Sequence, residues 1–117
     1  MDATSIQREC AVYEFGEFSL DIPERILTRG HRRVHLEPKS YLVLAVLVTR
    51  ANRLVTKREF LETVWPGVFV EEGILTVHVA HLRRALGETK SEWRFIETVS
   101  GAGYRFVGSV TCRELGG

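Results

Sequence analysis

Two histidines and two arginines between residues 72 and 86 are the side chains best suited to specific chemistry. His78 and His81 stand three positions apart, and Arg83 and Arg84 follow. Imidazoles bind metal ions or hydrogen-bond to bases, whereas guanidinium groups bind phosphates and base edges. No third ligand lies at metal-ligand spacing from the histidine pair. We therefore expect hydrogen bonding to a partner, with no metal ion and no other cofactor.

The apolar residues of this segment predict the helix that must carry these side chains. From Leu75 onward, four leucine and valine residues recur at i, i+4, i+7 and i+11, which makes one continuous stripe on a helix. Glu71 or Glu72 suits the positive end of the helix dipole, and Gly87 ends the helix. The stripe faces inward and leaves the opposite side for a partner. That side carries Gly73, Val77, Ala80, His81 and Arg84, with Arg83 at its edge.

Two more helices are predicted before this one. The first is expected over residues 38 to 51, because a proline suits the first turn of a helix. Its apolar run from 41 to 48 also fits a buried strand, but the length favours a helix that is buried on all sides. Thr56 and Glu59 match a capping box, which begins the second helix at Lys57.

Strands are predicted on both sides of the three helices. Apolar and polar residues alternate between residues 13 and 36, and β-formers flank the glycine-bracketed turn Ser100–Gly103. The resulting order is strands, three helices and a hairpin. This order is the outline of a winged helix-turn-helix.

Composition describes one globular domain over residues 13 to 108, with flexible tails at 1–12 and 109–117. The chain has 117 residues, of which 44% are apolar. Its longest apolar run is far shorter than the ~20 residues of a membrane helix, and no signal-peptide pattern is present. We expect a cytoplasmic protein without membrane contact. Cys10 and Cys112 are therefore expected as thiols, although domain ends often lie close enough for a disulfide.

The net charge of +1 conceals a segregated distribution. Residues 29 to 58 carry eight bases and one acid, whereas 1 to 28 and 59 to 72 each carry a net charge of −4. Residues 73 to 117 carry +2. The total argues neither for nor against a nucleic-acid partner, but the middle of the chain is strongly basic.

Five strings in the second half of the sequence closely resemble the C-terminal effector domain of OmpR/PhoB-type regulators. ToxR/CadC-like one-component regulators share this module. The resemblance covers about residues 13 to 108. The strings are Val64–Gly67, Leu75–Val79, Leu82–Gly87, Ile96–Val99 and Gly101–Phe106.

The resemblance implies an α+β winged helix-turn-helix with an N-terminal antiparallel four-stranded sheet, a three-helix bundle and a C-terminal β-hairpin wing. It implies sequence-specific binding of double-stranded DNA by a bacterial transcriptional regulator. In such domains the third helix, here residues 72–86, enters the major groove, and the wing, here 98–104, reaches the minor groove. The preceding loop, here 65–70, can contact RNA polymerase, and such domains usually bind direct repeats as dimers.

Ten residues are candidates for the DNA contact. We expect His81 and Arg84 to read bases, and Arg83, Thr98 and Tyr104 to bind phosphates. His78 borders the apolar stripe, so a packed or hydrogen-bonded histidine is its alternative. The two arginines also fit a solvated helix end. The full set is Trp65, Thr76, Val77, His78, His81, Arg83, Arg84, Thr98, Ser100 and Tyr104.

Departures from the family pattern leave a second function open. Gly73, Ala80 and Ser100 stand where family members often carry basic residues. Each lost phosphate contact flattens the log-log salt dependence by roughly 0.9, so we expect weak DNA binding by the isolated domain. A winged helix used for protein interaction is the alternative. An enzyme is not expected, because no nucleophile, base and acid meet on any motif.

Overall fold

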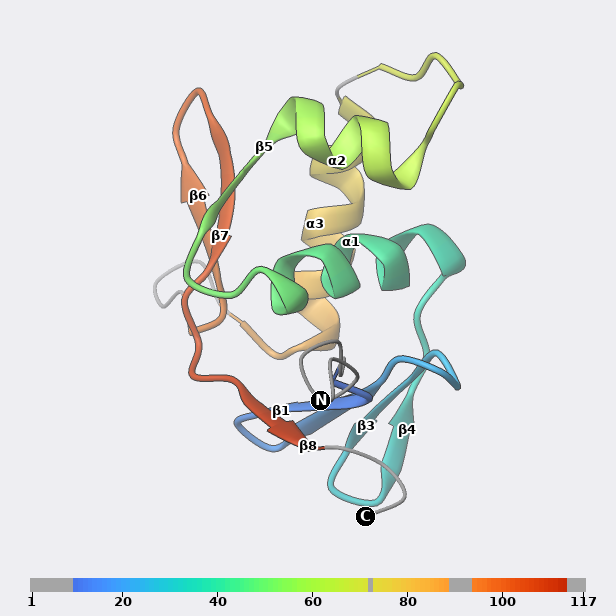
Figure 1. Cartoon of the computed structure of the whole chain (residues 1–117), viewed down its shortest axis with the longest axis vertical. Coiled ribbons are helices and arrows are strands. Elements are labelled where there is room, and N and C mark those ends of the chain that lie inside the picture. Colours follow the sequence, from blue (N-terminus) through green and yellow to red (C-terminus); the bar gives the residue numbers. More distant parts are fainter. Residues whose placement is uncertain (1–9, 72, 89–93, 114–117) are drawn as a thin grey trace, which may run out of the picture.

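The computed structural model describes residues 10–71, 73–88 and 94–113, which form two sheets around three helices (Figure 1). The larger sheet is antiparallel and has the order β4-β3-β2-β1-β8. Its first four strands are consecutive in sequence, as predicted. Its strands are β1 (Val12–Phe15), β2 (Phe18–Asp21), β3 (Ile26–Arg29), β4 (Arg32–Val34) and β8 (Thr111–Arg113).

The fifth strand of this sheet corrects the prediction of a flexible C-terminal tail from residue 109. Strand β8 pairs with β1, and this pairing places Cys112 opposite Tyr13. The Cα atoms of Cys10 and Cys112 lie 5.7 Å apart, and their sulfur atoms form a disulfide. The expectation of free thiols is therefore wrong for this structure. Both ends of the described chain are joined at one edge of the sheet.

The smaller sheet extends the predicted wing by one strand. Its order is β5-β7-β6, and β5 is a three-residue strand between the first two helices that the sequence pattern did not predict. Helix α1 is buried on most sides, as its apolar run predicted. No described helix is long and apolar enough to span a membrane. The remaining elements are α1 (Pro38–Thr49), β5 (Leu54–Thr56), α2 (Lys57–Val64), α3 (Gly73–Ala85), β6 (Ile96–Val99) and β7 (Gly103–Phe106).

An aromatic cluster joins the two sheets across the core. The ring of Phe15 lies edge-on to Phe106 and Phe95, with centroids 5.1 and 5.5 Å apart. Phe18 stacks on Phe15 from the neighbouring strand. All four rings are buried. Because the cluster connects the N-terminal sheet to the hairpin, the hairpin is held against the rest of the domain.

The capping box that the sequence predicted is present at the start of α2. The backbone N–H of Glu59 donates to Thr56 Oγ1 over 3.1 Å, and the Glu59 carboxylate accepts from the Thr56 backbone N–H over 2.9 Å. This backbone hydrogen bond is the main reason that the pKa of Glu59 lies below its ordinary value. The cap fixes the point where β5 becomes α2.

Replacing Thr56 with alanine is expected to lower the free energy of unfolding by about 1 kcal/mol, the usual cost of losing an N-cap. The substitution removes the side-chain acceptor of the Glu59 backbone N–H. Urea unfolding measures the change. Thr111→Ala, at an exposed position in β8, is the matched control and should cost much less; equal losses in the two variants would contradict this role of the cap.

Candidate nucleic-acid interface

Helix α3 buries one side and exposes the other. The predicted apolar stripe of Leu75, Val79, Leu82 and Leu86 is at most 2% exposed. Figure 1 shows α3 crossed by α1 and α2, with the β6–β7 hairpin beside it. The other side exposes Gly73, Thr76, Val77, Ala80 and Arg84. A helix that is anchored in this way can present that side to a partner.

Arg84 and Val77 are the two large side chains on the exposed side of α3. Val77 is 47% exposed, so its methyl groups lie on the solvent side of the helix. The Arg84 guanidinium makes no hydrogen bond or ion pair with another residue in the described parts of the chain. It is therefore exposed, and its role as a base contact stays a prediction.

Arg83 points in a different direction and ties α3 to the hairpin. Its Nη2 donates to the carbonyl oxygen of Ile96 and to Thr98 Oγ1, both over 2.8 Å. Arg83 and Thr98 are both predicted phosphate contacts. In the structure these two side chains are bonded to each other, so they position the hairpin relative to the helix.

Two of the remaining candidates pack inside the domain. The ring of Tyr104 is 7% exposed and lies edge-on to Phe60, with centroids 6.0 Å apart. Trp65 is 8% exposed and packs near the imidazole of His78. Ser100, in contrast, is exposed at the tip of the hairpin, where Gly101 takes a positive φ of 75°.

His78 is a packed and hydrogen-bonded histidine. It is 8% exposed, and its Nδ1 lies 2.7 Å from the hydroxyl oxygen of Ser40 on α1. Burial, the largest cause, holds the pKa of its imidazole below the usual 6.5, and the carboxylate of Glu37 opposes this shift. The ring is therefore neutral at neutral pH, and its Nδ1 is hydrogen-bonded inside the domain.

His81 lies one turn further along α3 and is half-buried. Its Nδ1 lies 3.8 Å from a carboxylate oxygen of Glu37, the residue that precedes α1. The sequence pattern contained no third ligand for the two histidines, and the structure supplies one from 41 positions before His78. Sequence spacing could not reveal Glu37, because only the packing of α1 on α3 brings it there.

Four of the eight bases between residues 29 and 58 form ion pairs with acids outside that segment. Arg29 pairs with Glu17 over 2.8 Å, and Arg58 pairs with Glu62 over 3.1 Å. Arg50 and Arg53 share the carboxylate of Glu59. The strong positive charge of residues 29 to 58 therefore adds less to a DNA-facing surface than its count suggests.

The loop before α3 presents two apolar side chains to solvent. Phe69 is 93% exposed and Val68 is 62% exposed. Large apolar residues in such positions are often contacts for another macromolecule. The family resemblance implies a contact with RNA polymerase for residues 65–70. Trp65, at the start of this loop, is buried, whereas Val68 and Phe69 are exposed.

Comparison with known proteins connects this architecture to a family. Residues 31–106 match the family described as "Transcriptional regulatory protein, C terminal". The KDP operon transcriptional regulatory protein KdpE of Escherichia coli K12 is 34% identical over 95 residues. The match covers 80% of this chain and 42% of KdpE, so the chain spans about two-fifths of that relative.

Two solved structures share the fold and exceed 25% sequence identity. Response regulator DrrB, a Thermotoga maritima OmpR/PhoB homolog, has a TM-score of 0.79 at 27% identity, over 90% of this chain and 48% of that one. The Klebsiella pneumoniae RstA DNA-binding domain, solved in complex with the RstA box, has a TM-score of 0.72 at 26% identity, over 82% and 96% of the two chains. The chain belongs to the OmpR/PhoB-type family of DNA-binding domains of transcriptional regulators and is not an enzyme.

Proposed function

We propose that this domain binds specific sequences of double-stranded DNA in a bacterial transcriptional regulator, with α3 in the major groove and the β6–β7 hairpin at the minor groove. The exposed side of α3 beside the hairpin is the observation that carries the proposal. A helix of about 10–12 Å diameter fits a major groove about 12 Å wide. RstA, a relative of the same fold, was solved with DNA.

Five exposed or half-exposed residues of α3 and the hairpin are the proposed contacts. The free guanidinium of Arg84 suits a guanine edge, and the methyl groups of Val77 suit a thymine methyl group. Thr76 and His81 can donate to bases or to phosphates. Ser100, at the hairpin tip, approaches the backbone. Trp65, His78 and Tyr104 support this surface from inside, and Arg83 with Thr98 sets the spacing between helix and hairpin.

The test is a selection of bound DNA from a random pool, followed by fluorescence anisotropy with the selected site and a single-base variant. Arg84→Ala is expected to reduce discrimination between the two by about 5- to 150-fold, the effect of one lost base contact of roughly 1–3 kcal/mol. Arg83→Ala should weaken binding to both sites alike, because the hairpin loses its link to α3.

Arg33→Ala removes an exposed arginine of β4, outside the proposed interface, and is the matched control. It should leave the discrimination ratio unchanged. Unchanged affinity and discrimination in Arg84→Ala would contradict the placement of α3 in the groove.

Protein interaction is the second candidate function, and the exposed Phe69 and Val68 favour it. We propose that this loop contacts RNA polymerase. The domain would make this contact in the cytoplasm, while it is bound to direct repeats of DNA as a dimer. A domain used only for protein interaction would show no salt-dependent DNA affinity. A DNA-binding domain loses affinity linearly on a log-log scale as salt rises, with a slope of roughly −0.9 for each phosphate contact.

A further inference from the structure

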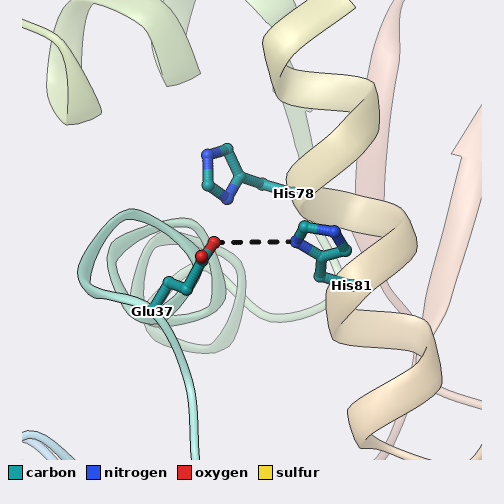
Figure 2. Close-up of side chains that lie close together, drawn as sticks. All are labelled: Glu37, His78 and His81. Carbon is teal, nitrogen blue, oxygen red and sulfur yellow. Dashed lines mark ion pairs between the residues drawn. The ribbon is translucent and has the colours of Figure 1, made fainter.

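Three potential metal ligands meet where the start of α1 packs on the middle of α3. Figure 2 shows the carboxylate of Glu37 reaching toward the imidazole rings of His78 and His81. One ligand atom from each residue lies within 4.8 Å of the other two. Neither the family match nor the proposed DNA contact accounts for this grouping.

We propose that Glu37, His78 and His81 form a binding site for a divalent transition-metal ion of the zinc class. Two imidazole nitrogens and one carboxylate are a ligand set that proteins use for zinc, with the fourth position left to water or another ligand. Imidazole also favours zinc, copper, nickel and cobalt over magnesium and calcium, which take oxygen ligands. The ligand chemistry therefore selects the class of ion.

Small side-chain movements suffice to close the site. Ligands at about 2.1 Å from a tetrahedral ion lie about 3.4 Å from one another, whereas the present ligand atoms lie within 4.8 Å, so their spacing must shrink by up to about 1.4 Å. The side chains of Glu37 and His81 are 62% and 41% exposed, and both can rotate without disturbing the core. The ion is thus reachable from solvent.

His78 is the fixed member of the site. Its ring is held by Ser40 over 2.7 Å and by packing near Trp65, with centroids 5.7 Å apart. In Figure 2 the His78 nitrogen that faces Glu37 and His81 is Nδ1, so an ion bound there would replace the hydrogen bond to Ser40, while the packing near Trp65 continues to hold the ring. The ammonium group of Lys39 lies close enough to help lower the pKa of His78, and it is held by donating to the carbonyl oxygen of Val64 over 3.0 Å.

The bound ion would connect α3 to the start of α1 through His81. His81 is also a proposed DNA contact, so the ion would fix the direction of one side chain of that surface. Metal binding itself depends only on the three ligands. It can therefore be measured without DNA, and it stands or fails separately from the proposed function.

Titration of the untagged, metal-free and disulfide-bonded protein with Co²⁺ tests the proposal, because cobalt bound by nitrogen and oxygen ligands gives visible absorption bands that zinc then abolishes. One ion per chain is expected. His81→Ala and Glu37→Gln should each weaken Co²⁺ binding by about 100-fold or more, since even the loss of an orienting contact costs 10- to 100-fold. Both residues are partly exposed, so circular dichroism should show unchanged folding.

The double variant His31→Ala/His35→Ala is the matched control, because it removes the two other histidines of the chain, both exposed. It should bind Co²⁺ like the original protein. Absence of the cobalt bands in the original protein would overturn the proposal. So would equal binding by His81→Ala and the original protein, or loss of binding in the control.

Discussion

Gly103→Ala is expected to lower the free energy of unfolding by about 3 kcal/mol or more, in the upper range for overpacking substitutions. A β-carbon at this position would overlap the carbonyl oxygen of Val55 and would lie 2.9 Å from the Cα atom of Thr56. Both are backbone atoms of the neighbouring strand β5, so no side-chain rotation relieves the overlap. The strands must separate, and their hydrogen bonds must break.

Two other glycines provide controls for Gly103→Ala. Gly101 has a φ of +75° with open space around it, so alanine there should cost only the roughly 1 kcal/mol of a left-handed backbone conformation. Gly73, in α3, has ordinary backbone geometry and open space, and alanine should not destabilise the fold. Urea unfolding of the three variants measures their free energies of unfolding and so their order of stability. A Gly103→Ala variant as stable as Gly73→Ala would show that β5 and β7 are not packed as described.

The parts of the fold that the sequence predicts are those set by neighbouring residues. The stripe that starts at Leu75 determines which side of α3 is buried, because helical periodicity depends only on local spacing. The capping box at Thr56 determines the start of α2 for the same reason. Both predictions are confirmed. Strands β5 and β8 were missed because each has three residues, too few for a periodic pattern, and neither is marked by a hairpin glycine as the three-residue β4 is by Gly30.

In the candidate site, too, the local sequence predicted which side chains are exposed, but it did not predict contacts with residues of other elements. Helical position predicted that Arg84 is exposed, and the structure agrees. The neighbouring Arg83 has the same charge, yet its partners are Ile96 and Thr98, which lie in another element. Glu37 was missed beside His81 for the same reason. A side chain's type indicates what it can bind, but its partner depends on how distant elements pack.

Reduction of the disulfide is expected to lower the free energy of unfolding by about 3 kcal/mol while the fold remains, within the usual range for a native disulfide. Cys10 and Cys112 are 102 positions apart, so the bond restricts almost the whole unfolded chain. The chain-entropy model gives about 4.7 kcal/mol for a loop of about 100 residues, and residual structure in the unfolded state reduces this value.

Urea unfolding with and without reductant measures the effect, and the slope of the transition should rise because the reduced unfolded chain exposes more surface. Cys112→Ser, which cannot form the bond, should have the lower stability in both conditions and is the control. An unchanged midpoint for the original protein on reduction would contradict the prediction. The folded state should persist because β8 is exposed and the aromatic core does not include it. Under reducing conditions, strand pairing and the Arg113–Glu14 ion pair at 3.3 Å would still hold β8 to β1.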